Sequence, residues 1–368
     1  MVSPSATKNY GLIRHSAGKA ILQEIPIPTV RDDYILVRTE AVALNPTDWT
    51  TLDRTGDNGT LVGCDYSGVV EQVGKNVTKQ WKVGDRVAGM AHGGNDLYPQ
   101  TGAFARYISV KGDFQLRVPD ETSFEAASAV GVGVISAGFG LYNVLGLPYP
   151  NVASGEKNQH EDGDQIRDRK VILIYGGSTA TGTLAIQFAK LSGHRVITTC
   201  SPKNFDLVKQ IGADAVYDYR TPGIGHQIRL DTSNQLSLVF DTVSTEITAQ
   251  ICADAIGSSG GQYVNLLGPD CPRSDVKSTF FLGYDVSGEE YIFEGERFPA
   301  RPDALAYARE FVPIAEKLWA QGKWRPHPLR LEKGGLNGVI DGLKILREGR
   351  YSAEKLVYRV NETEWPSV

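Results

Sequence analysis

The sequence predicts an α/β protein that combines a mostly-β part with a doubly wound parallel sheet. Three observations support this. Short β-rich runs, separated by glycine, proline and aspartate, fill the chain to about residue 120. The stretch from Val171 to Gly193 then has the pattern of a buried strand, a small-residue turn and a helix, and strand and helix signals alternate after it. A chain of 368 residues is also long enough for two domains.

Composition narrows the functional classes. A formal charge of -5 gives no basic field for nucleic acid. Four scattered cysteines form no C-x-x-C pair and no disulfide framework, which favours a reducing compartment. The N-terminal stretch has no apolar signal segment, so we expect a cytoplasmic protein.

The first part is expected to contain only strands and no helix. Its strand signals are Ile35–Ala43, Val69–Val73, Arg86–Ala88, Ala105–Val110 and Gln115–Val118. An uncharged segment, Ala126–Leu147, follows. It is long enough to cross a bilayer, but its glycines and polar residues favour a buried helix that starts near Thr122 or Ser123. Pro148–Arg169 is polar and predicts a surface loop.

Alternation from Val171 onward predicts a parallel sheet with five or six strands. Its signals are the strands Val171–Tyr175, Arg195–Thr199, Ala215–Tyr217, Leu236–Phe240 and a final Gln262–Leu267, and the helices Phe205–Ile211, Thr245–Ile256 and, later, Ala304–Trp319. The turn after the first strand carries Gly176, Gly177 and Gly182, an imperfect form of the dinucleotide motif. Backbone N–H groups at such a helix start can bind a pyrophosphate.

The end of the second strand indicates which nicotinamide cofactor is bound. NAD sites usually place an acidic residue there, whereas this chain has Ser201, Pro202, Lys203 and Asn204. A hydroxyl, a cation and an amide suit a 2′-phosphate, with Tyr219 as a further contact, so we predict NADPH. The alternatives are a solvated surface role for Lys203 and a helix N-cap role for Asn204.

Three ordered blocks precede this unit: Ala43–Trp49 (ALNPTDW), Gly63–Val70 (GCDYSGVV) and Val83–Val87 (VGDRV). Together with the glycine turn they resemble the medium-chain dehydrogenase/reductase superfamily, in its zinc-free quinone-reductase-like branch. The resemblance implies a GroES-like catalytic domain over residues 1–130, a Rossmann NADPH-binding domain over residues 131–300, and a return segment over residues 301–368 that completes the catalytic domain.

Zinc is not expected. Zinc-dependent members of the superfamily place a cysteine in the first block and a His-Glu pair in the second, where this chain has Asn45 and Cys64-Asp65. A single soft ligand cannot complete a tetrahedral site. Cys64 and Asp65 are therefore expected to serve packing and turn formation.

Several strings are similar to a narrower family, the fungal trans-acting enoyl reductases of polyketide synthases. They are YGGSTAT at Tyr175–Thr181, CSPKNFDL at Cys200–Leu207, DYR at Asp218–Arg220 and HPLR at His327–Arg330. The resemblance implies reduction of an α,β-unsaturated thioester carried on the acyl carrier domain of a partner polyketide synthase or synthase–peptide synthetase hybrid. We expect a monomer that works with neither nucleic acid nor a membrane.

The same resemblance implies the site residues. The cofactor-binding set is Thr47, Asp48, Trp49, Thr50, Ser136, Ser178, Thr179, Ala180, Thr181, Ser201, Pro202, Lys203, Asn204, Tyr219, Leu266, Leu267, Ser352 and Ala353. The substrate-binding set is Ala137, Gly138, Phe139, Gly140, Leu141, Tyr142, Asn143, Val144, Gly283, Tyr284, Asp285, Val286 and Ser287.

Thr50 departs from the family pattern, because many relatives carry a lysine at this place. Thr50 and Ser136 are the candidate catalytic residues, with backbone-satisfied hydroxyls as the alternative for both and water as another proton source. Two other functions remain open: a free-standing NADPH-dependent quinone or enone reductase, and a nucleotide-binding scaffold that has lost catalysis.

Overall fold

A computed structural model describes residues 8–54, 59–152 and 170–366. The chain divides into two compact units. Unit 1 is Met1–Val132, Tyr284–Glu316 and Pro326–Val368, and unit 2 is Gly133–Gly283 and Lys317–Arg325. The polar loop expected at residues 148–169 falls largely outside the described residues. The functional labels given to residues 1–130, 131–300 and 301–368 stay predictions.

Unit 1 contains a seven-stranded mixed sheet. Its strands are β3 (Tyr34–Ala43), β4 (Asp65–Val73), β5 (Arg86–Met90), β6 (Tyr107–Lys111), β7 (Leu116–Arg117), β16 (Leu329–Glu332) and β17 (Lys355–Arg359), in the order β16-β17-β3-β4-β5-β7 with β6 also paired to β3. A hairpin of β1 (Asn9–Ser16) and β2 (Lys19–Ile25) and another of β14 (Tyr291–Phe293) and β15 (Glu296–Phe298) complete the unit's strands in the described ranges. The C-terminal strand β17 pairs directly with β3, so the last part of the chain shares a sheet with the first part.

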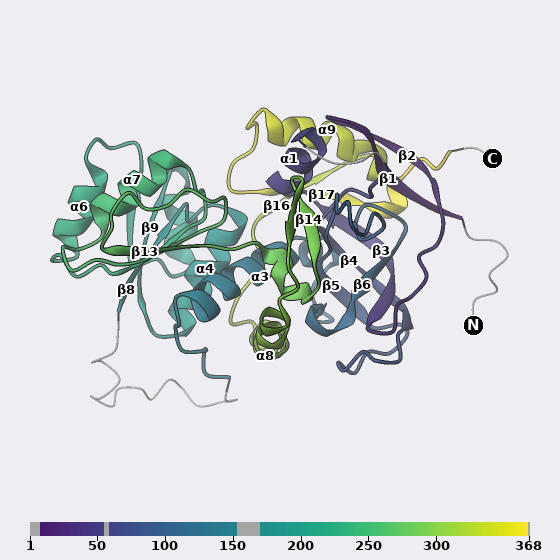
Figure 1. The fold of residues 1–368 in the computed structure, drawn as a ribbon, viewed down its shortest axis with the longest axis horizontal. Coiled ribbons are helices and arrows are strands. Elements are labelled where there is room, and N and C mark those ends of the chain that lie inside the picture. Colours follow the sequence, from purple (N-terminus) through teal and green to yellow (C-terminus); the bar gives the residue numbers. More distant parts are fainter. Residues whose placement is uncertain (1–7, 55–58, 153–169, 367–368) are drawn as a thin grey trace. The chain divides into compact units, whose positions relative to one another are not determined.

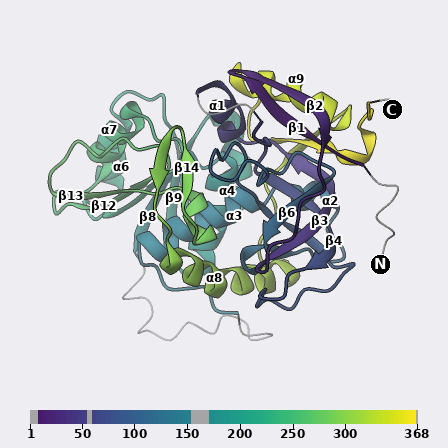
Figure 2. The same ribbon diagram turned by 45° about the vertical axis from the view of Figure 1, so that its right-hand side comes forward.

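The expectation that the first part has no helix is wrong. Residues Pro46–Arg54 form α1, which packs against α9 (Gly335–Arg347) in unit 1 (Figures 1 and 2). Proline at the first helical position and Asp48 in the first turn are favourable start signals. The helix lacks a long apolar stripe, and periodicity therefore did not indicate it.

Unit 2 is built on a six-stranded sheet in the order β10-β9-β8-β11-β12-β13, in which every neighbouring pair is parallel. The strands are β8 (Val171–Tyr175), β9 (Arg195–Cys200), β10 (Ala215–Asp218), β11 (Leu238–Asp241), β12 (Gly261–Asn265) and β13 (Val276–Phe280). Nearly all of β8, β9 and β11 is buried, as expected for a sheet covered on both faces. The predicted doubly wound sheet is confirmed, but β12 is not its last strand, because β13 follows.

The helices of this sheet are α4 (Ala180–Leu191), α5 (Phe205–Gln210), α6 (Ile224–Asp231) and α7 (Glu246–Ala255). Sequence analysis missed α6, which is short and half polar. α8 (Pro302–Ala320) confirms the expected helix near residue 304.

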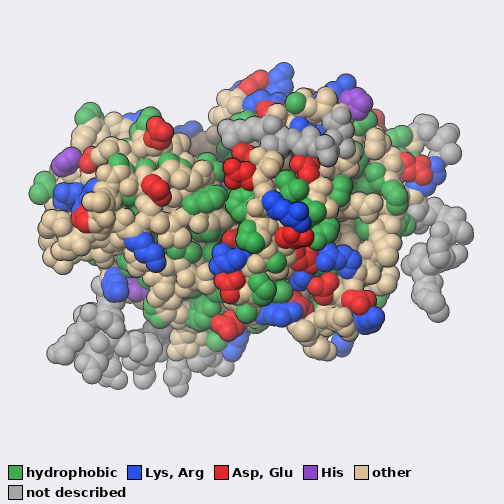
Figure 3. Space-filling model, viewed as in Figure 1, with side chains coloured by type: hydrophobic (Ala, Val, Ile, Leu, Met, Phe, Trp, Pro, Cys, Tyr) green, Lys and Arg blue, Asp and Glu red, His purple; other side chains and the backbone are tan. Residues whose placement is uncertain are grey.

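The uncharged segment after Ser123 is not one helix. It forms α2 (Phe124–Ser128), α3 (Gly131–Gly138) and a π-helix (Phe139–Val144), and Ser123 caps α2 by accepting a hydrogen bond from the Ala126 N–H at 3.2 Å. Among the described helices, none combines the length and the apolar character that a membrane span requires. The face shown in Figure 3 mixes acidic and basic side chains over short distances.

Candidate functional site

The glycine turn of unit 2 brings the end of β8 close to the start of α4. Gly176 adopts a positive φ of 81°, a conformation that favours glycine. At Gly182, a Cβ atom would collide with the Gly176 carbonyl oxygen, so only glycine allows the helix to start this close to the strand. These are the roles that the first and last glycines of a dinucleotide-binding turn require.

Thr179 is the N-cap of α4. Its hydroxyl accepts from the Gly182 N–H at 2.9 Å and lies 2.9 Å from the Thr242 hydroxyl. Of the turn residues predicted to bind the cofactor, Thr179 therefore already uses its hydroxyl within the protein. Over the described ranges, no hydrogen bond from the backbone N–H groups of Ser178, Ala180 and Thr181 is recorded, and these donors remain free for an anion.

A buried carboxylate organises the neighbouring strand ends. Asp241, at the end of β11, accepts hydrogen bonds from the N–H groups of Val243 and Ser244, at 2.9 Å each, and from the hydroxyls of Thr248 and Tyr263. The Ser244 hydroxyl in turn accepts from the Leu266 N–H at 2.9 Å. Asp241 thus fixes the backbone at predicted cofactor residue Leu266, whereas the neighbouring Leu267 side chain is 70% exposed.

The ends of β9 and β10 lie side by side in the sheet. Across them, the Ser201 hydroxyl is 3.5 Å from the Tyr219 hydroxyl, so these two predicted residues are brought together. Lys203 is exposed, and Asn204 stands at the N-cap position of α5 without a side-chain capping bond. The nearby carboxylate of Asp218 is paired with the Arg220 guanidinium at 3.0 Å, which neutralises its charge.

In unit 1, α1 carries the predicted residues of the first block. Thr47 and Thr50 are half-buried, and Thr50 donates its hydroxyl to the Thr47 carbonyl at 3.3 Å. That bond matches the alternative of a backbone-satisfied hydroxyl for Thr50. Asp48 is only 2% exposed and accepts from the Asn45 N–H at 2.7 Å, while its Oδ1 has no hydrogen-bond partner in the described structure. Burial raises the pKa of Asp48 to about 7.

Tyr284 links the segment after Gly283 to this block. Its hydroxyl lies 3.1 Å from the Thr47 hydroxyl and 3.3 Å from the Cys64 sulfur. Its ring stacks face to face on His92, with centroids 3.6 Å apart and an interplanar angle of 4°. Burial raises the pKa of both the Tyr284 phenol and the Cys64 thiol, so both groups are protonated at neutral pH.

Asp65 forms a buried ion pair with Lys355, the first residue of β17. The Lys355 ammonium also donates to Asn45 Oδ1 at 2.8 Å. Both oxygens of Asp65 accept further hydrogen bonds: Asn45 Nδ2 donates to Oδ2 at 3.0 Å and the Val132 N–H donates to Oδ1 at 2.7 Å. Asp65 is therefore more than a turn residue, because it joins three separate stretches of unit 1.

These contacts do not fit a zinc site. Zinc needs a thiolate at Cys64 and free carboxylate oxygens at Asp65, but the thiol is protonated and the carboxylate already receives hydrogen bonds from an amide, an ammonium and a backbone N–H. Within the described ranges, His, Cys, Asp and Glu form no cluster of three or more that could hold a metal.

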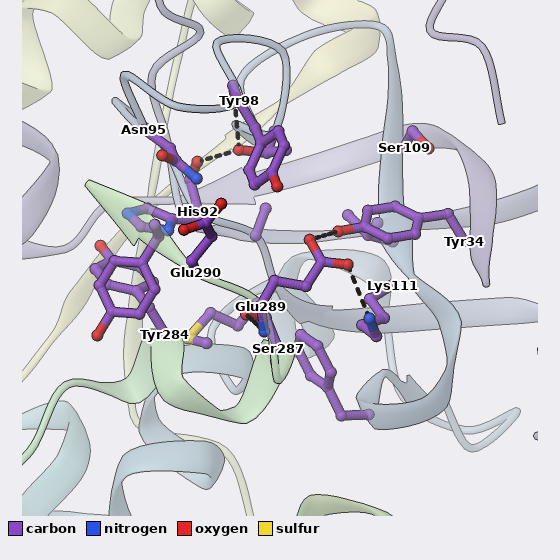
Figure 4. Close-up of a pocket in the computed structure, with 16 residues that line it drawn as sticks. Tyr34, His92, Asn95, Tyr98, Ser109, Lys111, Tyr284, Ser287, Glu289 and Glu290 are labelled. Atoms are coloured by element: carbon purple, nitrogen blue, oxygen red, sulfur yellow. Dashed lines mark hydrogen bonds and ion pairs between the residues drawn. The ribbon is translucent and has the colours of Figure 1, made fainter. Parts of the chain in front are cut away.

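A cavity of about 40 Å³ also lies in unit 1. Figure 4 shows Tyr284 and His92 near one side of it and Tyr34, Lys111 and Glu289 at another. Glu289 holds this second side together, since it pairs with Lys111 at 2.8 Å and Arg31 at 2.6 Å and accepts from the Tyr34 hydroxyl at 2.9 Å. Two predicted substrate residues, Tyr284 and Ser287, line this cavity.

The other predicted residues lie in two sets. Ser136 and the stretch 137–144 belong to unit 2, where Phe139 packs against Phe281 and the Tyr142 hydroxyl donates to the Phe188 carbonyl at 3.2 Å. Ser352 and Ala353 belong to unit 1, and Ala353 has a positive φ of 53°. Trp49 lies on α1, where its ring faces the Arg347 guanidinium.

Sequence reasoning missed three functional side chains: Lys355, Asp241 and His92. A lysine directly before an apolar run, and an aspartate directly after one, are signals of buried polar contacts that could have been used. His92 follows β5 with no local pattern that marks it.

Comparison with known proteins gives consistent matches. Residues 31–120 match the family of alcohol dehydrogenase GroES-like domains, and residues 180–269 match the zinc-binding dehydrogenases. Trans-enoyl reductase ACTTS2 of Alternaria alternata is 44% identical over 95% of this chain and 98% of its own. Trans-enoyl reductase TOXD of Cochliobolus carbonum is 47% identical over 80% of this chain and 98% of its own.

Solved structures agree on the fold. The CurK enoyl reductase matches with a TM-score of 0.75 at 17% identity, covering 96% of this chain and 99% of that one. An alcohol dehydrogenase superfamily protein from Novosphingobium aromaticivorans matches with a TM-score of 0.77 at 21% identity, covering 96% of this chain and 100% of that chain.

Proposed function

The chain belongs to the fungal trans-enoyl reductases of the medium-chain dehydrogenase/reductase superfamily, and we propose that it is an NADPH-dependent enoyl reductase. Its substrate is an α,β-unsaturated thioester on the acyl carrier domain of a partner polyketide synthase. The observation that carries this proposal is 44% identity over nearly the full length to a protein named a trans-enoyl reductase.

The glycine turn supports the binding of a dinucleotide. The free N–H groups of Ser178, Ala180 and Thr181 at the start of α4 would hold the pyrophosphate, while the Thr179 hydroxyl keeps the turn in shape. Leu266 and Leu267 follow β12 at the same edge of the sheet and would flank the nicotinamide.

Charge at the ends of β9 and β10 supports NADPH over NADH. Ser201, Lys203 and Tyr219 offer two hydroxyls and a cation, and the Asp218 carboxylate is neutralised by Arg220. A 2′-phosphate would thus meet donors without a net negative neighbour.

When bound, the nicotinamide supplies a hydride to the β-carbon of the thioester. The protein's task is to align the acyl chain and stabilise the charge that develops on the thioester oxygen. We assign alignment of the acyl chain to residues 137–144 and 283–287, and contact with the nicotinamide ribose to Thr47 and Thr50. Ser136, Ser352 and Ala353 are further proposed contacts of the nicotinamide.

The direct test is turnover by the purified protein. We expect NADPH oxidation with a crotonyl or hexenoyl thioester of pantetheine, and faster oxidation when the same acyl group is attached to an acyl carrier domain. Equal or faster turnover of a free quinone would favour a small-molecule quinone reductase instead. Binding of NADPH without oxidation on any enoyl thioester would indicate a scaffold.

A further inference from the structure

Four protonatable side chains of unit 1 lie next to one another in one path. The Thr47 hydroxyl is 3.1 Å from the Tyr284 hydroxyl, which is 3.3 Å from the Cys64 sulfur. The Cys64 thiol neighbours the Asp48 carboxyl, whose Oδ1 has no hydrogen-bond partner in the described structure. Asp48, Cys64 and Tyr284 are buried, whereas Thr47 is partly exposed. The path therefore leads from an interior carboxyl group to an accessible hydroxyl; we call these four residues the Asp48–Thr47 relay.

We propose that the Asp48–Thr47 relay delivers the proton that the α-carbon receives during enoyl reduction. The proposal rests on the proposed function. Besides the nicotinamide ribose, Thr47 also contacts the substrate in this proposal, and Tyr284, Cys64 and Asp48 act through it. The relay fills the role for which the sequence offered only Thr50 and Ser136.

The step balances in atoms and electrons. The hydride that reaches the β-carbon moves the electron pair of the double bond into an enolate. The α-carbon then takes the Thr47 proton, forming a C–H bond as the O–H bond breaks. Thr47 recovers a proton from Tyr284, Tyr284 from Cys64, and Cys64 from the Asp48 carboxyl, and water reprotonates Asp48 before the next turnover.

The protonation state of Asp48 sets the direction of the relay. A neutral carboxyl donates to Cys64, which lets the thiol donate to Tyr284 and the phenol donate to Thr47, so that the Thr47 hydrogen is left for the substrate. An ionised carboxylate accepts from the thiol instead, and every hydrogen in the path then points inward. Only neutral Asp48 therefore gives an outward proton path.

The groups around Asp48 determine up to which pH its carboxyl group stays neutral. Burial is the largest influence and raises its pKa to about 7; the Asp65 carboxylate acts in the same direction. The Asn45 N–H, the Cys64 thiol and the Lys355 ammonium favour the ionised form. The Tyr284 phenol is the remaining titratable neighbour, and burial raises its pKa as well, which keeps its proton available.

The arrangement also holds the phenol in place. Stacking on His92 fixes the Tyr284 ring, and among the described residues its hydroxyl has two hydrogen-bond partners, the Thr47 hydroxyl on one side and the Cys64 sulfur on the other. At rest, the Thr51 hydroxyl lies 3.4 Å from the Thr47 hydroxyl and offers it an internal partner until a substrate arrives.

Tyr284→Phe tests the relay, because it removes only the hydroxyl and keeps the stacked ring. Reduction of a pantetheine enoyl thioester is followed with NADPH in D₂O, and NMR gives the configuration of the deuterium at the α-carbon. We expect the wild type to deuterate one face. The variant should lose about 100-fold in kcat, a typical loss for a positioned acid, and should deuterate both faces with an unchanged Kd for NADPH.

Tyr66→Phe is the control. It removes another buried phenol, which is hydrogen-bonded to Gln115 at 2.9 Å, and its kcat should stay within about twofold of wild type.

Asp48→Asn tests the direction of the relay. The amide has no proton to supply, so the variant should be slow at every pH up to 9, whereas the wild-type rate should fall as pH rises through about 7. A Tyr284→Phe enzyme that keeps its rate and its single deuterated face, or an Asp48→Asn enzyme with the wild-type pH profile, would overturn the relay. A wild-type protein that reduces no enoyl thioester would refute the proposed function itself, which separates the two failures.

Discussion

At the scale of single residues, we expect the largest loss of stability when the Asp65–Lys355 ion pair is broken. Both side chains are buried, and their partners come from stretches almost 300 residues apart. Lys355→Met would leave the Asp65 carboxylate buried without its cation, and we expect a loss of about 3–5 kcal/mol in the free energy of unfolding. Denaturant unfolding of unit 1 measures this loss.

A second variant separates charge from packing. Adding Asp65→Asn to Lys355→Met makes the site neutral and should restore most of the stability, because the uncompensated charge is removed. The exposed pair Lys8–Glu24 is the matched control: Lys8→Met should leave the free energy of unfolding nearly unchanged. A double variant no more stable than Lys355→Met would contradict a charge-based role for the pair.

Single residues were the hardest part of this site to predict from sequence. The turn glycines were found because their role depends on local backbone geometry within seven residues. Lys355, His92 and Tyr284 act through partners that only the folded sheet brings near, and no local pattern marks such contacts. The expectation that Asp65 serves packing and a turn thus missed its ion pair.

At the scale of elements, strand ends matter more than strand interiors for function. Ser201 and Lys203 follow β9, and Tyr219 follows β10, so the predicted 2′-phosphate contacts come from two neighbouring strands. The double variant Lys203→Ala with Tyr219→Phe should raise the Kd for NADPH at least tenfold and leave the Kd for NADH within about twofold, because only NADPH carries the phosphate. Fluorescence titration of both cofactors measures this, and equal losses for the two would remove the 2′-phosphate assignment.

Elements with strong periodicity or burial were predicted well. Sequence patterns predicted the buried strands β8, β9 and β11 and the helices α4, α7 and α8. They also predicted that the strands of this sheet run parallel. The misses share a physical cause. α1 and α6 are short and rich in polar residues. In the segment after Ser123, uniform apolarity concealed the break between α2 and α3 and the change from α3 to a π-helix.

At the scale of the whole molecule, buried titratable groups make stability depend on pH from both sides. Burial lowers the pKa of His92 and His327 to about 3. Their contribution to the free energy of unfolding is therefore complete above their ordinary pKa of 6.5 and is lost as pH falls toward 3. Asp48 acts in the opposite direction. Its folded-state pKa of about 7 exceeds the ordinary value of 3.8. Its contribution to the free energy of unfolding is therefore complete below pH 3.8 and is lost as pH rises to about 7.

Asp48→Asn tests the loss of stability that ionisation of Asp48 causes as pH rises. The amide can still accept from the Asn45 N–H but carries no charge, so the variant escapes the loss that the wild type suffers between pH 4 and 7. We expect the variant's melting temperature, relative to wild type, to increase from pH 5 to pH 8, by the equivalent of at most about 3 kcal/mol. Asp120→Asn, at an exposed carboxylate, should show no such trend. A constant difference between Asp48→Asn and wild type across this range would mean that Asp48 is already ionised at pH 5, and the interior end of the relay would then have no proton to supply.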